Sequence, residues 1–278
     1  MERVSKQSKI GKAIVNLFCL IAIVVVLFPL LWMFSGGFKT DTMLFSSPWA
    51  LPKTIDFSNF IDVWNKCIST NVFNSVFYTV VGTLLTVLFS GFAAYAIVRF
   101  RFKHKYLVFI FILSGMMLAP QCSLIPIYKI LGFLHLYDTR IGLILPYVAY
   151  RIPFSFFLMW TYMVSLPVEI DEAACIDGCK IHQTFFKIVM PMSKPVIATT
   201  AIMAARYIWN DFAFALVFTE SDKLQTIPLG LFSLRSANNT QWTELLAGLA
   251  IASLPMIIMY ALLQKYFVNG LNSGAVKG

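Results

Sequence analysis

Residues Val76–Val98 read VFYTVVGTLLTVLFSGFAAYAIV, a run without one charged side chain, and the basic cluster RFRFKHK at residues 99–105 follows it directly. A helix of about 23 residues is about 33 Å long at 1.5 Å per residue, which matches the roughly 30 Å hydrocarbon core of a bilayer. Lys and Arg accumulate on the cytoplasmic side of membrane helices. The stretch therefore predicts a membrane-spanning helix whose basic end lies in the cytoplasm.

The composition of the whole chain agrees with a membrane protein. Of its 278 residues, 59% are hydrophobic and 13% are charged, and the mean hydropathy is +0.76. Soluble domains are roughly 45–50% apolar and about 25% charged, and a soluble surface could not accommodate this excess. Disordered chains are poor in apolar residues, so disorder is excluded as well. We predict an all-α, polytopic protein of the cell membrane with one domain over residues 1–278.

Five further apolar stretches have a similar length, which predicts six spanning helices in total. They are Ala13–Phe34, Tyr106–Ile127, Ile141–Met163, Val196–Phe218 and Leu245–Phe267. The first stretch follows a basic N-terminus as in a signal peptide, but it is too long for the apolar region of one, so we expect an anchor. With these six spans, thirteen Lys and Arg lie on the same side of the membrane as the N-terminus, and seven lie on the opposite side. This asymmetry predicts that both termini are cytoplasmic.

Two segments are expected on the outer side. Residues Ser35–Phe73 are long and mixed in composition, and we expect one or two short interfacial helices there. Residues Thr219–Thr243 contain Pro228 and Gly230, which indicate an irregular loop.

The cytoplasmic segment between the fourth and fifth spans, residues 165–195, is the most informative. Acidic residues at 169, 171 and 172 suit the positive end of a helix dipole, and Gly178 suits the left-handed turn that ends a helix. A second amphipathic helix should follow with Ile181, Phe185 and Ile188 on one face, stopped by Pro191 and Pro195. The segment is therefore expected to form a helix, a glycine corner and a second helix, which together could fit a groove on a partner.

The spacing of this segment resembles a known family. Glu172-Ala173-Ala174, three residues, Gly178, nine residues and Ile188-Val-Met-Pro191 match the EAA loop of permeases of ATP-binding-cassette (ABC) importers, with Met190 in place of Leu. Trp209-Asn210-Asp211 and the C-terminal FVNGLNSGAVKG from Phe267 resemble the smaller permease of maltose-type carbohydrate importers. The resemblance covers essentially the whole chain and implies the type I ABC importer permease fold.

The resemblance also implies the partners and their contact residues. The segment would be a coupling helix that docks into a cytoplasmic ATPase subunit, through Glu172, Ala173, Ala174, Ile176, Asp177, Gly178, Ile188 and Pro191. The C-terminal residues Gly270, Gly274 and Lys277 would reach toward the same ATPase dimer. The remaining partners would be a second, homologous permease and an extracytoplasmic sugar-binding protein that contacts residues Thr219–Thr243. ATP and Mg²⁺ would bind to the ATPase pair, so this chain would itself bind no cofactor.

A second group of candidate residues lies within the predicted spans, on the translocation pathway or at a gate. It comprises Arg151, Arg206, Trp209, Asn210 and Asp211. Charges inside a membrane are costly unless they face protein or water, so these side chains indicate either a pore or pairing between helices. Asp211 is expected to pair with a neighbouring helix, with Arg151 as one candidate. Trp209 could stack on a sugar ring or pack between helices.

Several other functions lack their sequence signals. The segment GGFKT at residues 36–40 lacks the glycine that a phosphate-binding loop needs before its lysine, so ATP hydrolysis is not expected of this chain. Cys175, Cys179 and His182 have no fourth ligand nearby and predict no metal site. No sizeable region outside the predicted spans holds a basic stretch interleaved with exposed aromatics, so a nucleic-acid partner is not expected. The alternatives are an ion-coupled carrier using Arg151, Arg206 and Asp211, and a membrane enzyme, for which no nucleophile is evident.

Overall fold

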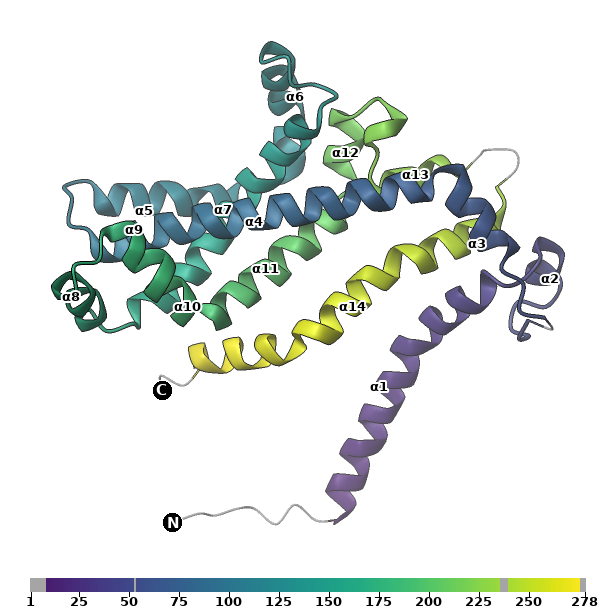
Figure 1. Cartoon of the computed structure of the whole chain (residues 1–278). Helices are drawn as coiled ribbons and strands as arrows, with labels where there is room; N and C mark the ends of the chain where they lie inside the picture. The colour runs from purple at the N-terminus through teal and green to yellow at the C-terminus, as the bar shows by residue number, and fades with distance from the viewer. Residues whose placement is uncertain (1–8, 53, 236–239, 276–278) are drawn as a thin grey trace. The chain divides into compact units, whose positions relative to one another are not determined.

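The computed structural model describes residues 9–52, 54–235 and 240–275, and these residues form helices joined by turns, without a strand among them (Figure 1). The chain divides into two compact units. The first comprises residues Met1–Cys67 and Ser233–Ile251, and the second comprises Ile68–Phe232 and Ala252–Gly278. An all-helical architecture follows from the apolar runs, because a helix satisfies its own backbone hydrogen bonds in lipid.

The first unit contains helix α1 (Lys9–Gly36), two short helices α2 (Asp41–Ser46) and α3 (Ser58–Val63), and the first turns of α14 (Trp242–Ala275). The expected short helices are therefore present in the segment after the first span, and their place at the membrane interface stays a prediction. The large apolar side chains of α1 are exposed from Ile14 to Leu31, whereas Trp32, Met33 and Phe34 in its last turns are half-buried.

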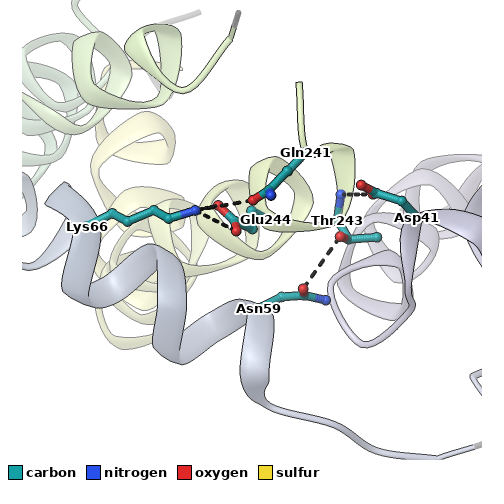
Figure 2. A network of polar contacts seen from close by, with 6 residues as sticks. All are labelled: Asp41, Asn59, Lys66, Gln241, Thr243 and Glu244. Carbon is teal, nitrogen blue, oxygen red and sulfur yellow. Dashed lines mark hydrogen bonds and ion pairs between the residues drawn. The ribbon is translucent and has the colours of Figure 1, made fainter. Parts of the chain in front are cut away.

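A network of polar contacts joins α2, α3 and the π-helical turn η1 (Trp64–Ile68) to the start of α14 (Figure 2). The Lys66 ammonium donates to Glu244 Oε1 at 2.6 Å and to Gln241 Oε1 at 3.2 Å. The Thr243 amide donates to Asp41 Oδ1 at 3.1 Å, and the Thr243 hydroxyl donates to Asn59 Oδ1 at 3.5 Å. These contacts use the backbone and side chains of the first turn of α14, where the helix has no internal partners for its N–H groups.

The core of the second unit consists of α4 (Ser69–Arg99), α7 (Arg140–Val164) and α11 (Lys194–Trp209). Helix α4 packs along α7, and α11 packs against both (Figure 1). Buried apolar side chains form two clusters along these helices, one around Tyr147 and Phe214 and the other around Phe156 and Phe185. The predicted spans Val76–Val98 and Ile141–Met163 are thus continuous helices.

The third predicted span, Tyr106–Ile127, is not one straight helix. Helix α5 (Lys105–Ser114) passes through the short 3₁₀ turns η2 (Gly115–Met117) and η3 (Pro120–Ser123) into α6 (Leu124–Phe133), and the two halves meet at 98°. Ala119 is extended, with φ −69° and ψ 128°, as expected for a residue before proline. Pro120 itself has no N–H to continue the helix, so the apolar run is broken there.

The fifth predicted span, Val196–Phe218, is also interrupted. Helix α11 ends at Trp209, and a separate short helix α12 (Ala213–Phe218) begins after three residues.

By length and composition, four described helices could cross a membrane, namely α1, α4, α7 and α14. The two bent helix pairs, Lys105–Met117 with Pro120–Phe133 and Ile181–Met192 with Lys194–Trp209, would raise that number to six. The six-span count and the cytoplasmic termini remain predictions.

The segment after α12 is more ordered than its proline and glycine suggest. It contains η5 (Asp222–Leu224) and the helix α13 (Ile227–Ser233), so the expectation of an irregular loop is wrong for residues 227–233. Pro228 stands in the first turn, where a missing N–H costs nothing. Gly230 allows close packing, because a Cβ there would lie 1.7 Å from Nδ2 of Asn71.

Candidate functional site

The predicted helix in the loop after α7 is α8 (Glu169–Ile176), which begins two residues after Pro167. Gly178 ends it in the left-handed conformation, with φ 76°. The Gly178 amide donates to the Cys175 carbonyl at 3.0 Å, and the Cys179 amide donates to the Ala174 carbonyl at 2.9 Å. This pair of bonds is the Schellman motif of helix ends. The predicted glycine corner is therefore confirmed.

Most of the EAA-type residues on α8 face away from the rest of the chain. Glu172, Ala173, Asp177 and Gly178 are exposed, and only Ala174 is buried. Ile176 is 87% exposed, which is unusual for a large apolar side chain at a helix end. An exposed apolar tip flanked by acidic groups offers hydrophobic area and charge to a partner surface.

Asp171, on the same helix, faces inward and contacts the end of α4. Its Oδ2 lies 2.7 Å from Nε of Arg99 in an ion pair, and its Oδ1 accepts a hydrogen bond of 2.7 Å from the Tyr95 hydroxyl. Nη2 of Arg99 also donates to the carbonyls of Leu166 and Pro167, each at 3.2 Å. The sequence did not indicate this contact, because Arg99 stands among other basic residues and Asp171 among other acidic ones.

The second arm of the loop consists of α9 (Ile181–Thr184), a π-helical turn η4 (Phe185–Val189) and α10 (Met190–Met192). Phe185 and Val189 are buried, whereas Ile181 is exposed and Ile188 is half-buried. The predicted face of Ile181, Phe185 and Ile188 is therefore wrong for Ile181, which stands at the first position of α9 and is not covered by the rest of the chain.

The second arm ends before the fifth predicted span as expected, but its end lies at Met192, between Pro191 and Pro195, rather than at either proline. Helical structure continues through the exposed Pro191, and the chain instead bends by 82° at Ser193. Both Pro191 and Pro195 lie in the first positions of new helical segments, α10 and α11. A proline is compatible with a first turn because the N–H groups there have no helical partner.

The candidate residues within the spans have different partners. The Asp211 carboxylate bonds to helix α7 through the Tyr147 hydroxyl at 3.0 Å, rather than to Arg151 as one expectation had it. The same oxygen, Oδ2, accepts from the amides of Phe214 and Ala215 at 3.1 and 3.2 Å and so caps α12. Asp211 thus pairs with a neighbouring helix as predicted, through a different residue.

Arg151 and Trp209 are both engaged inside the second unit. The Arg151 guanidinium lies over the rings of Phe154 and Tyr207, at 5.1 and 4.9 Å from their centroids. The Trp209 indole is buried and donates from Nε1 to the Ala252 carbonyl at 3.2 Å. This position fits the packing interpretation of Trp209 rather than stacking on a sugar.

Arg206 on α11 and Asn210 at its C-cap are exposed and four residues apart as expected, and Nδ2 of Asn210 donates to the Arg206 carbonyl at 2.8 Å. At the C-terminus, Gly270 and Gly274 fall within α14. Lys277 lies outside the described residues.

The chain matches a known family of transport proteins. Residues 70–273 match the family model described as binding-protein-dependent transport system inner membrane component. The chain is 44% identical to a probable ABC transporter permease protein, YurM, of Bacillus subtilis, over 97% of this chain and 90% of that protein. It is 33% identical to MalG of Thermococcus litoralis, a trehalose/maltose transport system permease protein, over 92% and 93% of the two chains.

A solved structure has the same fold. It is the crystal structure of a bacterial ABC transporter involved in the import of the acidic polysaccharide alginate. The superposition gives a TM-score of 0.82 at 25% sequence identity, and it covers 96% of this chain and all of the compared chain.

Proposed function

This chain belongs to the family of inner membrane components of binding-protein-dependent transport systems, and on that premise we propose that it is the permease subunit of an ABC importer for a carbohydrate. It is a multi-pass protein of the cell membrane. The substrate class rests on relatives such as the trehalose/maltose permease. The single observation that carries the mechanism is the exposed helix α8, with Glu172 and Ile176 directed away from the chain and its end fixed by Gly178.

The proposed partner of α8 is a cytoplasmic ATPase subunit. Ile176 supplies an apolar contact that becomes favourable once it is removed from water, and Glu172 supplies a charge for a basic side chain. Ala173 lets the partner approach the helix closely, and Gly178 sets the direction of the chain after it. Half-buried Ile188 and exposed Pro191 lie on the second arm of the same loop.

The assembly that this function requires has several chains. We expect a second permease, two ATPase subunits and an extracytoplasmic sugar-binding protein, with both termini of this chain in the cytoplasm. We expect ATP and Mg²⁺ to bind to the ATPase pair, and we propose that Gly270, Gly274 and Lys277 contribute to the contact with it. Closure of the ATPase pair moves α8, and the spanning helices alternate between outward and inward access. This chain makes and breaks no covalent bond in the cycle.

An ion-coupled carrier is not supported. In the described residues Asp211 bonds to Tyr147 and to the amides at the start of α12, and Arg151 lies over the rings of Phe154 and Tyr207, so both side chains have structural partners. The relatives named above are a probable ABC transporter permease and a permease of a trehalose/maltose transport system.

The test is uptake of a panel of labelled mono- and oligosaccharides by a deletion strain that carries the parental gene or a variant. Glu172→Lys should reduce uptake of the transported sugar by at least about tenfold, the loss that about 1.4 kcal/mol of coupling would cause. The matched control is Glu169→Lys on the same helix, which should stay near the parental rate. Parental uptake by Glu172→Lys would contradict docking through this residue. Uptake that depends on an ion gradient rather than on cellular ATP would contradict the importer.

A further inference from the structure

The end of helix α4 holds the docking loop by a set of contacts at Arg99. Its guanidinium pairs with Asp171 on α8 and donates to the carbonyls of Leu166 and Pro167, the residues that lead into α8. The side chains of Arg99 and Asp171 are 9% and 16% exposed, so water screens the pair only weakly. One planar guanidinium thus fixes both the start of the helix and the stretch of chain before it.

Tyr95, one helical turn earlier on α4, adds a contact to each arm of the loop. Its hydroxyl donates to Asp171 Oδ1 at 2.7 Å, and its ring lies 5.3 Å from the ring of Phe185 on the second arm. Phe92 stacks on the same Phe185 at 4.5 Å. The two arms are therefore attached to the same last turns of α4.

The covalent connections of α8 do not fix its direction by themselves. Residues 165–168 between α7 and α8 are not helical, and residues 177–180 after α8 form the glycine corner. A short helix between two such joints can pivot, unless side chains bind it to a rigid neighbour. The contacts with Arg99 and Tyr95 are that attachment.

The other end of α4 is bound to the segment after α12. Asn74 Nδ2 donates to the carbonyls of Lys223 and Gln225 at 2.8 and 3.1 Å, and the Tyr78 hydroxyl donates to the Leu224 carbonyl at 3.1 Å. Helix α4 has 31 residues, or about 46 Å at 1.5 Å per residue. One continuous helix therefore carries both attachments, and a rigid element of this kind can transmit a displacement between distant sites.

We propose that Arg99 is a positioning residue that transmits movement of α8 to helix α4, and through α4 to the segment at residues 223–225. This inference rests on the proposed function, because it takes α8 as the ATPase-docking helix. Arg99 itself does not touch the ATPase. Its role is to make α8 and α4 move together. Binding of the sugar-binding protein on the outer side of the membrane can then stimulate ATP hydrolysis by the ATPase in the cytoplasm.

The test uses the complete transporter, purified through a tag on this chain together with its permease, ATPase and binding-protein partners and reconstituted in lipid. Arg99→Gln keeps hydrogen-bonding capacity but removes the cation, and Arg101→Gln is the matched control, because Arg101 is an exposed arginine two residues later. The measurements are the amount of ATPase bound per permease and the ratio of ATP hydrolysis with and without loaded binding protein.

We expect Arg99→Gln to bind the ATPase at the parental level while the stimulation ratio falls at least about fivefold, the lower end of typical coupling between sites. Arg99→Lys should recover part of the ratio, because it keeps the charge. A stimulation ratio in Arg99→Gln equal to that of Arg101→Gln would overturn the proposal. If the parental complex shows no bound ATPase at all, the proposed function fails instead.

A second measurement does not depend on ATP hydrolysis. Cys175 is an exposed native cysteine on α8 and accepts a nitroxide label once the other four cysteines are replaced by serine. The label should become more mobile in Arg99→Gln and not in Arg101→Gln. Equal mobility in the two variants would overturn the positioning role, even if Arg99→Gln lowers the yield of folded protein.

Discussion

Lys66 and Glu244 lie 178 positions apart in the chain, and the Lys66 ammonium lies 2.6 Å from Oε1 of the Glu244 carboxylate (Figure 2). Lys66 is half exposed, whereas the Glu244 side chain is only 12% exposed. The contact fixes the first turn of α14 to the segment that follows α3. The contribution of this ion pair to stability depends mainly on Glu244. A mostly buried carboxylate that loses its cation destabilises the fold more than an exposed one does.

The first prediction concerns this pair. Lys66→Met should destabilise the protein by about 1 kcal/mol, which lowers Tm by about 2–4 °C in a chain of this size. Adding Glu244→Gln to that variant should recover part of the loss, because the remaining side chain is neutral. Thermal unfolding in detergent measures both effects. Lys129→Met, at an exposed lysine of α6, is the control, and an equal loss there would contradict the assignment.

The second prediction concerns the glycine corner. A Cβ at Gly178 would meet nothing within 4 Å, so the only cost of Gly178→Ala is the left-handed backbone with φ 76°. That cost is about 1–2 kcal/mol, and sugar uptake should fall with it. Gly178→Asn should lose less, since Asn tolerates this conformation.

Gly132→Ala is the matched control for Gly178→Ala. Gly132 lies in helix α6 and also has open space around its Cβ. Alanine is the better helix former, so this change should be neutral or slightly stabilising. Equal effects at the two positions would show that the left-handed backbone at Gly178 is unimportant.

The third prediction is a pH dependence at Asp138, in the turn between α6 and α7. Burial acts to raise the pKa of this carboxyl, but hydrogen bonds from the Ser221 hydroxyl and from the Ser221 and Glu220 amides outweigh it, so its pKa lies below the ordinary value. A lowered pKa stabilises the fold above the unfolded pKa of about 3.9, and this contribution disappears as the pH falls through the folded pKa.

Asp138→Asn should therefore lower Tm at pH 7, and the difference from the parent should shrink below about pH 4. Thermal unfolding between pH 7 and pH 3 measures it, and the comparison cancels acid effects common to both proteins. A Tm difference that stays constant down to pH 3 would contradict the role of the charge.

The fourth prediction concerns the break between α11 and α12. Asp211→Ala removes the acceptor for the Phe214 and Ala215 amides and for the Tyr147 hydroxyl. Loss of a helix cap of this kind costs about 1–2 kcal/mol. Asp211→Asn keeps an oxygen acceptor and should lose less. The measurements are Tm and sugar uptake, with Asn210→Ala as the neighbouring control, and unchanged values for Asp211→Ala in both assays would leave Asp211 without a special role.

Local sequence signals predicted some elements well. The end of α8 at Gly178 was predictable because a Schellman turn depends on one residue that tolerates positive φ. The breaks at Pro120 and after Trp209 were missed, because a hydropathy pattern measures how apolar a segment is and does not see where its helix bends. Pro120 itself was the available signal for the first of these breaks.

The amino-acid sequence by itself determined the membrane character, the helical class and the family, since these follow from composition, run length and a gapped motif within one segment. Only the tertiary structure decided which of several candidate polar side chains form contacts between helices. Arg99 rather than Arg101 meets Asp171, and Tyr147 rather than Arg151 meets Asp211. Such pairings depend on how distant helices are rotated and offset against each other, and that packing is set by the whole unit rather than by any local pattern.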